Sequence, residues 1–369
     1  MARSAVLVER MERVRASMAT AGVDVLLLSL GADLPWLTGY EAMPLERLTM
    51  LVLPRDAGAT LVVPRLEAPR VEHHPEVFAL RPWEETESPV RIVGELAGLT
   101  GVAAIGDRTW SQFLVDLQAE APAVTWRKAS TVTSPLRSVK DAAEVEALRR
   151  AGAAADRVAA QLQGGAIPLV GRTEAEVSAD LGRRLVAEGH HKVNFAIVAA
   201  GPNAASPHHE PGERVIEAGQ LVLCDFGGTT PDGYCSDITR CVHTGPVPSD
   251  VADAYALLQE AQALAVAAAT VGTPCEEIDG AARRRITEGG HGPDFIHRTG
   301  HGIGLEAHED PYLVLGNTEP LVAGHAFSIE PGIYLEGRWG LRLEDIVVAT
   351  GDGPDPLNLA DHDLVVVEA

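Results

Sequence analysis

Apolar residues near the start of the chain recur every three or four positions, as they do on one face of a helix. The recurring residues are Leu7, Met11, Val14 and Met18, and they predict a helix over 7–21. Short apolar runs bounded by Gly, Pro or Asp follow at 25–28, 49–53 and 60–63, and such runs are typical of buried strands. The pattern predicts an α/β unit over residues 1–135, in which we find no catalytic constellation.

The pattern changes near residue 136. The segment 133–140 interrupts the alternation of apolar runs, and a long segment rich in Ala, Glu and Arg begins at Asp141, which predicts a helix. A chain of 369 residues commonly folds as two domains. We therefore predict one domain over 1–135 and a second over 136–369.

The second domain repeats part of its sequence at an offset of 101 residues. Both copies carry helix-start signals, Thr173 with Glu176 in the first and Thr273 with Pro274 and Glu276 in the second. Two amphipathic helices can look alike by chance. A shared offset over scattered positions nevertheless favours a duplicated unit. The matched positions are Val170-Gly171 with Val271-Gly272, Glu176 with Glu277, Arg183-Arg184 with Arg284-Arg285, and Gly189-His190 with Gly290-His291.

The repeat extends to two strands that each end in an acid. The run from Ala218 to Gly227 contains Asp225, and the similar run from Ala323 to Gly332 contains Glu330. Each run is followed by a Gly-containing turn and a second strand with another acid: Asp237 follows Gly233, and Glu344 follows Gly340. A histidine precedes each hairpin, His208 in the first copy and His301 in the second. The sequence thus predicts two related hairpins that each carry two acids.

Four acids in two matched hairpins predict a metal site. Asp225 follows the apolar run 221–224, where an unpaired carboxylate is costly, and the turn signal at 230–233 returns the chain so that Asp237 approaches it. A single acid at a strand end is usually solvated. Four converging carboxylates repel one another in a low-dielectric site, however, and two divalent cations would neutralise them.

Histidines cluster in the glycine-rich segment 299–309. His301 and His308 lie in it, and Gly302 and Gly304 indicate a tight, irregular backbone. His297 and His301 have the spacing of a helical zinc site, but the His-Glu-x-x-His motif is absent from the sequence. Two histidines in this context favour a functional role over a structural one.

Taken together, these motifs resemble the pita-bread metallopeptidases, and most closely their Xaa-Pro branch, which comprises prolidase and aminopeptidase P. The resemblance implies an α+β protein: a C-terminal pita-bread fold with an internal pseudo-twofold repeat, preceded by a smaller, creatinase-like α/β domain. The motifs that carry it are Asn194-Phe-Ala-Ile-Val, Pro207-His-His, Cys224-Asp-Phe-Gly, Tyr234-Cys-Ser-Asp-Ile-Thr-Arg240, Gly300-His-Gly-Ile-Gly-Leu-Glu-Ala-His308, Ser328-Ile-Glu-Pro-Gly332 and Leu341-Arg-Leu-Glu-Asp345.

The resemblance also implies a role for each residue of the site. Glu330 would double as a metal ligand and the general base, and His208 would stabilise the tetrahedral intermediate. His308 would contact the scissile peptide and His297 would line the proline pocket, whereas Arg342 would support the ligands. The cofactor implied is a pair of divalent ions, Mn²⁺ before Co²⁺ or Zn²⁺. The implied metal ligands are Asp225, Asp237, His301, Glu330 and Glu344.

The composition of the chain limits the binding partners that can be expected. The net charge is −22 and no run of Lys and Arg occurs, so neither nucleic acid nor a membrane is an expected partner. Charged residues at the N-terminus interrupt any signal-peptide core, and the four cysteines show no Cys-x-x-Cys spacing. These features predict a cytoplasmic protein.

The predicted activity is hydrolysis of the Xaa-Pro bond at the N-terminus of short proline-containing peptides. The alternatives are a metal-free amidinohydrolase of the creatinase type, a non-catalytic binding protein on the same fold, and a methionine aminopeptidase. The retained ligands argue against the first two, and the extra N-terminal domain argues against the third. The stretch from Glu309 to Tyr312 lacks a cation for a dipeptide's carboxylate, which favours aminopeptidase over dipeptidase.

The resemblance further predicts a homodimer. Trp36 lies in the segment 33–40, which has turn character, and it is expected near the partner's substrate cleft. The alternative is that Trp36 belongs to the core of its own domain.

Overall fold

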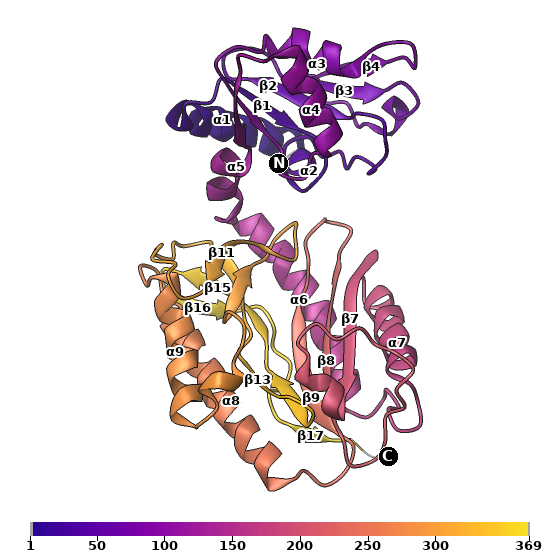
Figure 1. The fold of residues 1–369 in the computed structure, drawn as a ribbon, viewed down its shortest axis with the longest axis vertical. Coiled ribbons are helices and arrows are strands. Elements are labelled where there is room, and N and C mark those ends of the chain that lie inside the picture. Colours follow the sequence, from indigo (N-terminus) through magenta and orange to yellow (C-terminus); the bar gives the residue numbers. More distant parts are fainter. Residues whose placement is uncertain (1–2, 368–369) are drawn as a thin grey trace. The chain divides into compact units, whose positions relative to one another are not determined.

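The computed structural model describes residues 3–367. The chain divides into two compact units between Arg137 and Ser138 (Figure 1). Each unit has its own sheets and its own apolar core. In the described part of the chain, no helix combines the length and apolarity needed to cross a bilayer.

The N-terminal unit is built on a six-stranded mixed sheet in the order β4-β3-β2-β1-β5-β6. The predicted first helix is confirmed and is longer than expected, and the three predicted strands are confirmed as β1, β2 and β3. Side chains of β1 and β2 pack with those of α3 and α4 in one apolar cluster. The elements are α1 (Arg3–Ala21), β1 (Val25–Leu28), α2 (Asp33–Thr38), β2 (Met50–Pro54), β3 (Thr60–Pro64), η1 (Ala68–Arg70), β4 (Ala79–Trp83), α3 (Pro89–Ala97), β5 (Val102–Ile105), α4 (Ser111–Glu120), β6 (Thr125–Lys128) and α5 (Ser130–Arg137).

Trp36 belongs to the core of the N-terminal unit. The segment predicted as a turn is the short helix α2, which ends at Gly39 in the left-handed conformation (φ 72°). Trp36 is 2% exposed, and the guanidinium of Arg10 on α1 lies 5.1 Å from its ring. The core alternative is therefore correct for Trp36. The homodimer stays a prediction.

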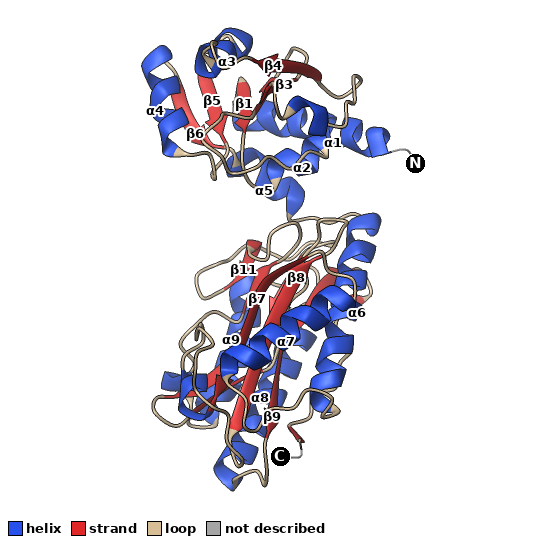
Figure 2. Cartoon of the chain, turned by 90° about the vertical axis from the view of Figure 1, so that its right-hand side faces the viewer, coloured by secondary structure: helices blue, strands red, loops and turns tan. Residues whose placement is uncertain are grey.

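The C-terminal unit has two halves of matching construction (Figures 1 and 2). In the first half two helices precede the sheet β17-β9-β8-β7, and in the second two helices precede the sheet β11-β10-β12-β15-β16. The elements of the first half are α6 (Ala142–Gln163), α7 (Glu174–Ala187), β7 (Lys192–Ala200), η2 (Gly201–Ala205), β8 (Leu221–Thr229) and β9 (Ile238–His243). Those of the second are α8 (Ser249–Ala268), α9 (Cys275–Glu288), η3 (Gly292–Asp294), β10 (Gly300–Gly302), β11 (Glu309–Leu313), β12 (Ala326–Ile329), β13 (Gly332–Leu335), β14 (Trp339–Arg342), β15 (Asp345–Thr350) and β16 (Gly353–Pro356). The last strand, β17 (Val365–Val366), returns to the sheet of the first half and pairs with β9.

Helices α7 and α9 confirm the predicted repeat. They begin at Glu174 and Cys275 and are both 14 residues long, so they share the offset of 101. Thr173 and Glu176 form the predicted capping box at the start of α7. The corresponding prediction for α9 is wrong, because Pro274 occupies the capping position and offers no side-chain acceptor.

The alternation of side chains along β8 directs Asp225 into the space between the halves. Val222, Cys224 and Phe226 pack with the cluster of α6 and α7, whereas the odd-numbered positions face the opposite side. The strand does not end at Asp225 as predicted but continues through Gly227 and Gly228 to Thr229. Only glycine fits at position 228 of this strand, because a Cβ there would lie 2.5 Å from the carbonyl oxygen of Lys192. Asp225 is therefore held in mid-strand.

The second hairpin is more elaborate than predicted. Gly340 lies within β14 rather than in a turn, and the small sheet β13-β14 is inserted between β12 and β15. In the antiparallel pair of β12 and β15, Ile329 lies opposite Asp345. Glu330 and Glu344, which come directly after β12 and directly before β15, therefore also lie opposite each other. An isolated bridge between Thr239 and Glu344 joins the sheets of the two halves at this point.

Candidate metal centre

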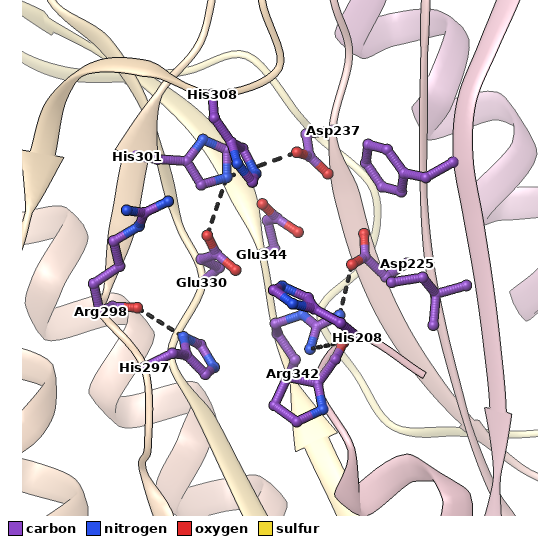
Figure 3. A pocket seen from close by; sticks show the side chains of 13 residues that line it. His208, Asp225, Asp237, His297, Arg298, His301, His308, Glu330, Arg342 and Glu344 are labelled. Atoms are coloured by element: carbon purple, nitrogen blue, oxygen red, sulfur yellow. Dashed lines mark hydrogen bonds and ion pairs between the residues drawn. The ribbon is translucent and has the colours of Figure 1, made fainter. Parts of the chain in front are cut away.

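One cavity of about 470 Å³ in the C-terminal unit brings all nine predicted site residues together (Figure 3). Its wall also contains four residues that the sequence analysis did not assign to the site. The predicted residues are His208, Asp225, Asp237, His297, His301, His308, Glu330, Arg342 and Glu344, and the additional ones are Phe195, Ile197, Pro207 and Arg298.

Both halves of the unit contribute acids to this cavity. Asp225 comes from the middle of β8, and Asp237 directly precedes β9. Glu330 follows β12, Glu344 precedes β15, and His301 is the central residue of β10. The predicted convergence of four carboxylates and one imidazole is therefore present in the structure.

The closest group within this set consists of Asp237, His301 and Glu344, whose ligand atoms lie within 4.8 Å of one another. The Nε2 atom of His301 is 3.1 Å from Glu330 Oε1 and 3.8 Å from Asp237 Oδ2. Its other ring nitrogen, Nδ1, donates to the carbonyl oxygen of Gly302 at 3.1 Å. A histidine whose second nitrogen is bound in this way is fixed in one tautomer and presents Nε2 as a ligand.

Two carboxylate oxygens in the cavity are buried without a hydrogen-bond partner in the described part of the chain, Asp225 Oδ1 and Glu344 Oε1. Burial raises the pKa of both carboxyl groups, and repulsion from Glu330 adds to the effect. Burial likewise raises the pKa of Asp237, with repulsion from Glu344 as the next cause. A buried acceptor left unpaired costs about 1–3 kcal/mol. Bound cations would satisfy these oxygens and keep the carboxylates ionised.

Arg342 and Thr239 fix the remaining oxygens of Asp225 and Glu344. Arg342 Nη2 donates to Asp225 Oδ2 at 2.6 Å, and its Nε donates to the Thr239 hydroxyl at 3.1 Å. That hydroxyl in turn donates to Glu344 Oε2 at 2.7 Å. Arg342 thus orients Asp225 directly and Glu344 through Thr239, one acid from each half. Thr239 carries no signal in the sequence that would place it in the site.

A second chain of hydrogen bonds runs from Arg342 to His297. Arg342 Nη1 donates to the Tyr334 hydroxyl at 2.8 Å, and that hydroxyl is 2.8 Å from His297 Nε2. Because His297 Nδ1 donates to the carbonyl oxygen of Arg298 at 2.7 Å, Nε2 of the neutral ring accepts the tyrosine proton. Burial lowers the pKa of His297, which favours this neutral form. Tyr334 gave no signal in the sequence.

His308 packs against His301 at the cavity wall, with the two rings tilted by 54°. The ring centroids are 4.0 Å apart. Burial lowers the pKa of His308 to about 4, and the nearby charge of His301 adds to the effect. His308 is therefore neutral near pH 7 and can donate one N–H without bringing a charge into the cavity.

His208 lies on a loop anchored by a buried carboxylate. Glu174, at the start of α7, is completely buried and accepts from His209 Nε2 at 2.7 Å and from the Ala200 backbone N–H at 2.8 Å. It also accepts from the Asn203 side chain at 3.0 Å. This role of Glu174 could not be predicted from the sequence, because an acid in the first turn of a helix is an ordinary helix-start residue.

Comparison with known proteins identifies the class that this fold and site define. The profile of Metallopeptidase family M24 matches residues 146–351, and that of the Creatinase/Prolidase N-terminal domain matches residues 10–139. The chain belongs to metallopeptidase family M24 and carries a creatinase-like N-terminal domain, as the sequence motifs predicted. It is a metallo-exopeptidase that uses divalent metal.

Individual relatives cover nearly all of the chain. A probable dipeptidase PepE from Mycobacterium bovis is 44% identical over 98% of this chain and 97% of its own length. An Xaa-Pro dipeptidase from Lactobacillus helveticus is 35% identical over 93% of this chain and 95% of its own. The crystal structure of dipeptidase PepE from Mycobacterium ulcerans superposes with a TM-score of 0.93 at 43% identity, covering 100% of this chain and 99% of that one.

Proposed function

We propose that the chain uses two divalent metal ions to hydrolyse the Xaa-Pro bond at the N-terminus of short peptides. The observation that carries the proposal is the pair of buried, unpartnered oxygens on Asp225 and Glu344, which face a cavity where His301 also presents Nε2. The names of the relatives, dipeptidase and Xaa-Pro dipeptidase, support the choice of substrate.

The donor set fits two divalent ions. Four carboxylates carry a charge of −4 when ionised, which two ions of charge +2 would balance, and an imidazole completes the set. Oxygen-rich ligands with one nitrogen suit Mn²⁺ first, with Co²⁺ and Zn²⁺ as alternatives. When bound, such a pair of ions activates a water molecule and polarises the carbonyl group that the water attacks. The residues that would hold them are Asp225, Asp237, His301, Glu330 and Glu344.

Glu330 is the proposed general base. The hydroxyl of Ser328 donates to its Oε1 at 3.1 Å, and His301 Nε2 approaches the same oxygen. Burial raises the pKa of Glu330, but contacts with His301, His297 and Arg342 outweigh it and lower the pKa to about 2. When His301 is neutral and bound to metal, the positive charge of the ions would keep Glu330 ionised instead. A carboxylate held ionised in this way can accept a proton from water.

Two histidines that are not proposed ligands would stabilise the reacting peptide. His208 and His308 both line the cavity, and each can donate an N–H to an oxygen on which negative charge develops. The neutral state of His308 suits a contact with the carbonyl group of the substrate. Phe195, Ile197 and Pro207 provide the apolar part of the wall.

His297 would line the pocket for proline. Its ring is held by Tyr334 and by the Arg298 carbonyl, so it presents a fixed, uncharged surface. Proline lacks a backbone N–H and has a restricted φ, so ordinary extended-chain recognition does not accommodate it. A rigid pocket of this kind is therefore a physical requirement of the proposed specificity.

The test is removal and return of metal. Protein treated with a chelator is expected to lose hydrolysis of Ala-Pro and of Ala-Pro-Ala, and to regain it with Mn²⁺ or Co²⁺. Metal analysis should give close to two ions per chain, and thermal unfolding should shift upward when they bind. Full activity after verified metal removal would contradict the assignment and favour a metal-free amidinohydrolase.

A further inference from the structure

A second arginine lies on the cavity wall beside the proposed proline pocket. Arg298 directly follows His297 and precedes β10, which carries His301 (Figure 3). The buried carboxylate of Asp279 on α9 accepts from the backbone N–H and the hydroxyl of Thr299, at 3.0 and 2.9 Å. The backbone of Arg298 is therefore fixed from both sides, because its own carbonyl also accepts from His297.

The two arginines of the cavity differ in what they bind. Arg342 is buried and donates to Asp225, Thr239 and Tyr334. Arg298 is half-buried, and no carboxylate among residues 3–367 forms an ion pair with it. Its positive charge contributes, after burial and His301, to the lowered pKa of His308. Arg298 thus brings an unpaired cation to the wall that carries His308.

The Arg298 guanidinium is oriented by an aromatic ring. It lies 4.3 Å from the ring centroid of Tyr312 on β11. Stacking on a tyrosine leaves the edge of the guanidinium and its N–H groups free, and it restricts the rotation of a side chain that would otherwise be mobile. The planar fork of donors then matches the two oxygens of a carboxylate.

We propose that Arg298 binds the C-terminal carboxylate of an Xaa-Pro dipeptide and so makes the enzyme select dipeptides over longer peptides. The inference rests on the proposed function. In a dipeptide the carboxylate follows the scissile carbonyl by a single residue, roughly 3.3–3.6 Å of chain. A cation that reaches it must therefore lie beside the proline pocket, and Arg298 is adjacent to His297 in sequence and near His308 in space.

The proposed role of Arg298 runs against the expectation drawn from the sequence. The stretch from Glu309 to Tyr312 has no cation, which favoured longer substrates. In the structure, the ring of Tyr312 lies instead against the guanidinium of Arg298, which precedes His301 in the sequence. The preference is therefore for dipeptides.

The test compares substrates that differ only in this charge. Wild type, R298A, R298Q and the control R284A, all loaded with Mn²⁺, are assayed on Ala-Pro, Ala-Pro-amide and Asp-Pro. Arg284 is an exposed arginine of α9 outside the cavity. We expect R298A and R298Q to lose roughly 10- to 100-fold in kcat/KM on Ala-Pro, mainly through KM, which is the scale of a charge-assisted hydrogen bond. Activity on Ala-Pro-amide should stay within about twofold of wild type, as should every activity of R284A.

Three results would overturn the inference. The first is an equal loss on Ala-Pro and Ala-Pro-amide at unchanged metal content, which would make Arg298 a structural residue. The second is a loss confined to Asp-Pro, which would assign Arg298 to an acidic N-terminal side chain. The third is no loss at all. If wild type cleaves none of these substrates, the proposed function fails, and this inference fails with it.

Discussion

Three of the four carboxylates of the cavity are held by a group that is itself bound elsewhere. Asp225 is held by Arg342, Glu344 by Thr239, and Glu330 by Ser328. In the two cases where an oxygen is left without a partner, the orphaned atom is the one not used by this supporting contact. Such an arrangement fixes ligand orientation before a metal binds, and loss of a supporting contact commonly costs 10- to 100-fold in affinity or activity.

His208 and His308 are expected to act on the substrate rather than on the metal. Replacement of either by Ala should lower kcat by about 100- to 10,000-fold, the range for lost proton transfer or oxyanion stabilisation. Metal content should stay near two ions per chain, because neither residue belongs to the proposed ligand set. Steady-state kinetics with metal analysis on the same samples checks both statements, and a variant that loses metal would show that its histidine is a ligand.

The sequence predicted the convergence of the proposed ligands better than the contacts of the residues that support them. Asp225, Asp237, Glu330 and Glu344 stand at matched places in two similar segments, so their convergence could be inferred. Contacts such as the one between Thr239 and Glu344 join positions 105 residues apart and depend on how the two sheets meet. Common residue types such as Thr and Tyr carry no local signal of a contact of that kind.

At the scale of the element, the loop after η2 depends on a single carboxylate. Glu174 accepts hydrogen bonds from Ala200 and Asn203 before the loop and from His209 within it, immediately after His208. Hydrogen bonds to a charged group contribute about 1.5–3 kcal/mol each. The start of α7 is thereby coupled to the position of a residue with a proposed catalytic role.

Replacing Glu174 by Gln should therefore affect turnover as well as stability. The amide keeps the shape of the side chain but loses its charge and one acceptor, so we expect kcat to fall by about tenfold with little change in KM. The matched control is Glu176→Gln, an exposed acid of the same helical turn that serves only the capping box. Equal effects of the two substitutions on kcat would show that Glu174 acts only through the helix. Calorimetry and kinetics on both variants distinguish the outcomes.

Helix positions could be predicted more accurately than strand ends. The offset of 101 placed α7 and α9 correctly because helical periodicity extends over many residues. The predicted end of β8 and the predicted turn of the second hairpin were wrong, because both predictions depended on how glycines were interpreted. A glycine in a sequence often indicates a turn. Gly228 and Gly340 instead lie in strands, at places where the backbone of another segment comes too close for a Cβ.

At the scale of the whole C-terminal unit, one buried histidine links stability to pH. His325 is 8% exposed and its Nδ1 accepts from the Val322 backbone N–H at 3.4 Å. Burial lowers its pKa to about 4, and the charge of Lys140 adds to the effect. The unfolded chain, in which histidine titrates near 6.5, therefore binds more protons than the folded chain between about pH 4 and 6.5.

The folded state should consequently lose stability as the pH falls through 6.5, and the loss should level off below about 4. Replacing His325 by Asn, whose side-chain oxygen can accept the same hydrogen bond, should make the melting temperature less dependent on pH over this range. The control is His191→Asn, at an exposed position of the same unit. Thermal denaturation of the three proteins between pH 5 and 7.5 checks the prediction, and identical slopes for wild type and His325→Asn would contradict it.

The bridge between Thr239 and Glu344 has a consequence for the lifetime of the folded chain. Because the acids come from both sheets that meet there, metal cannot be held unless both halves are folded and in contact. A metal present at 100 times its dissociation constant would then resist their separation by about 2.7 kcal/mol. Any transient opening that exposes the chain to a protease would become rarer by the same factor, about a hundredfold. Metal supply would thus govern the survival of this enzyme as well as its turnover.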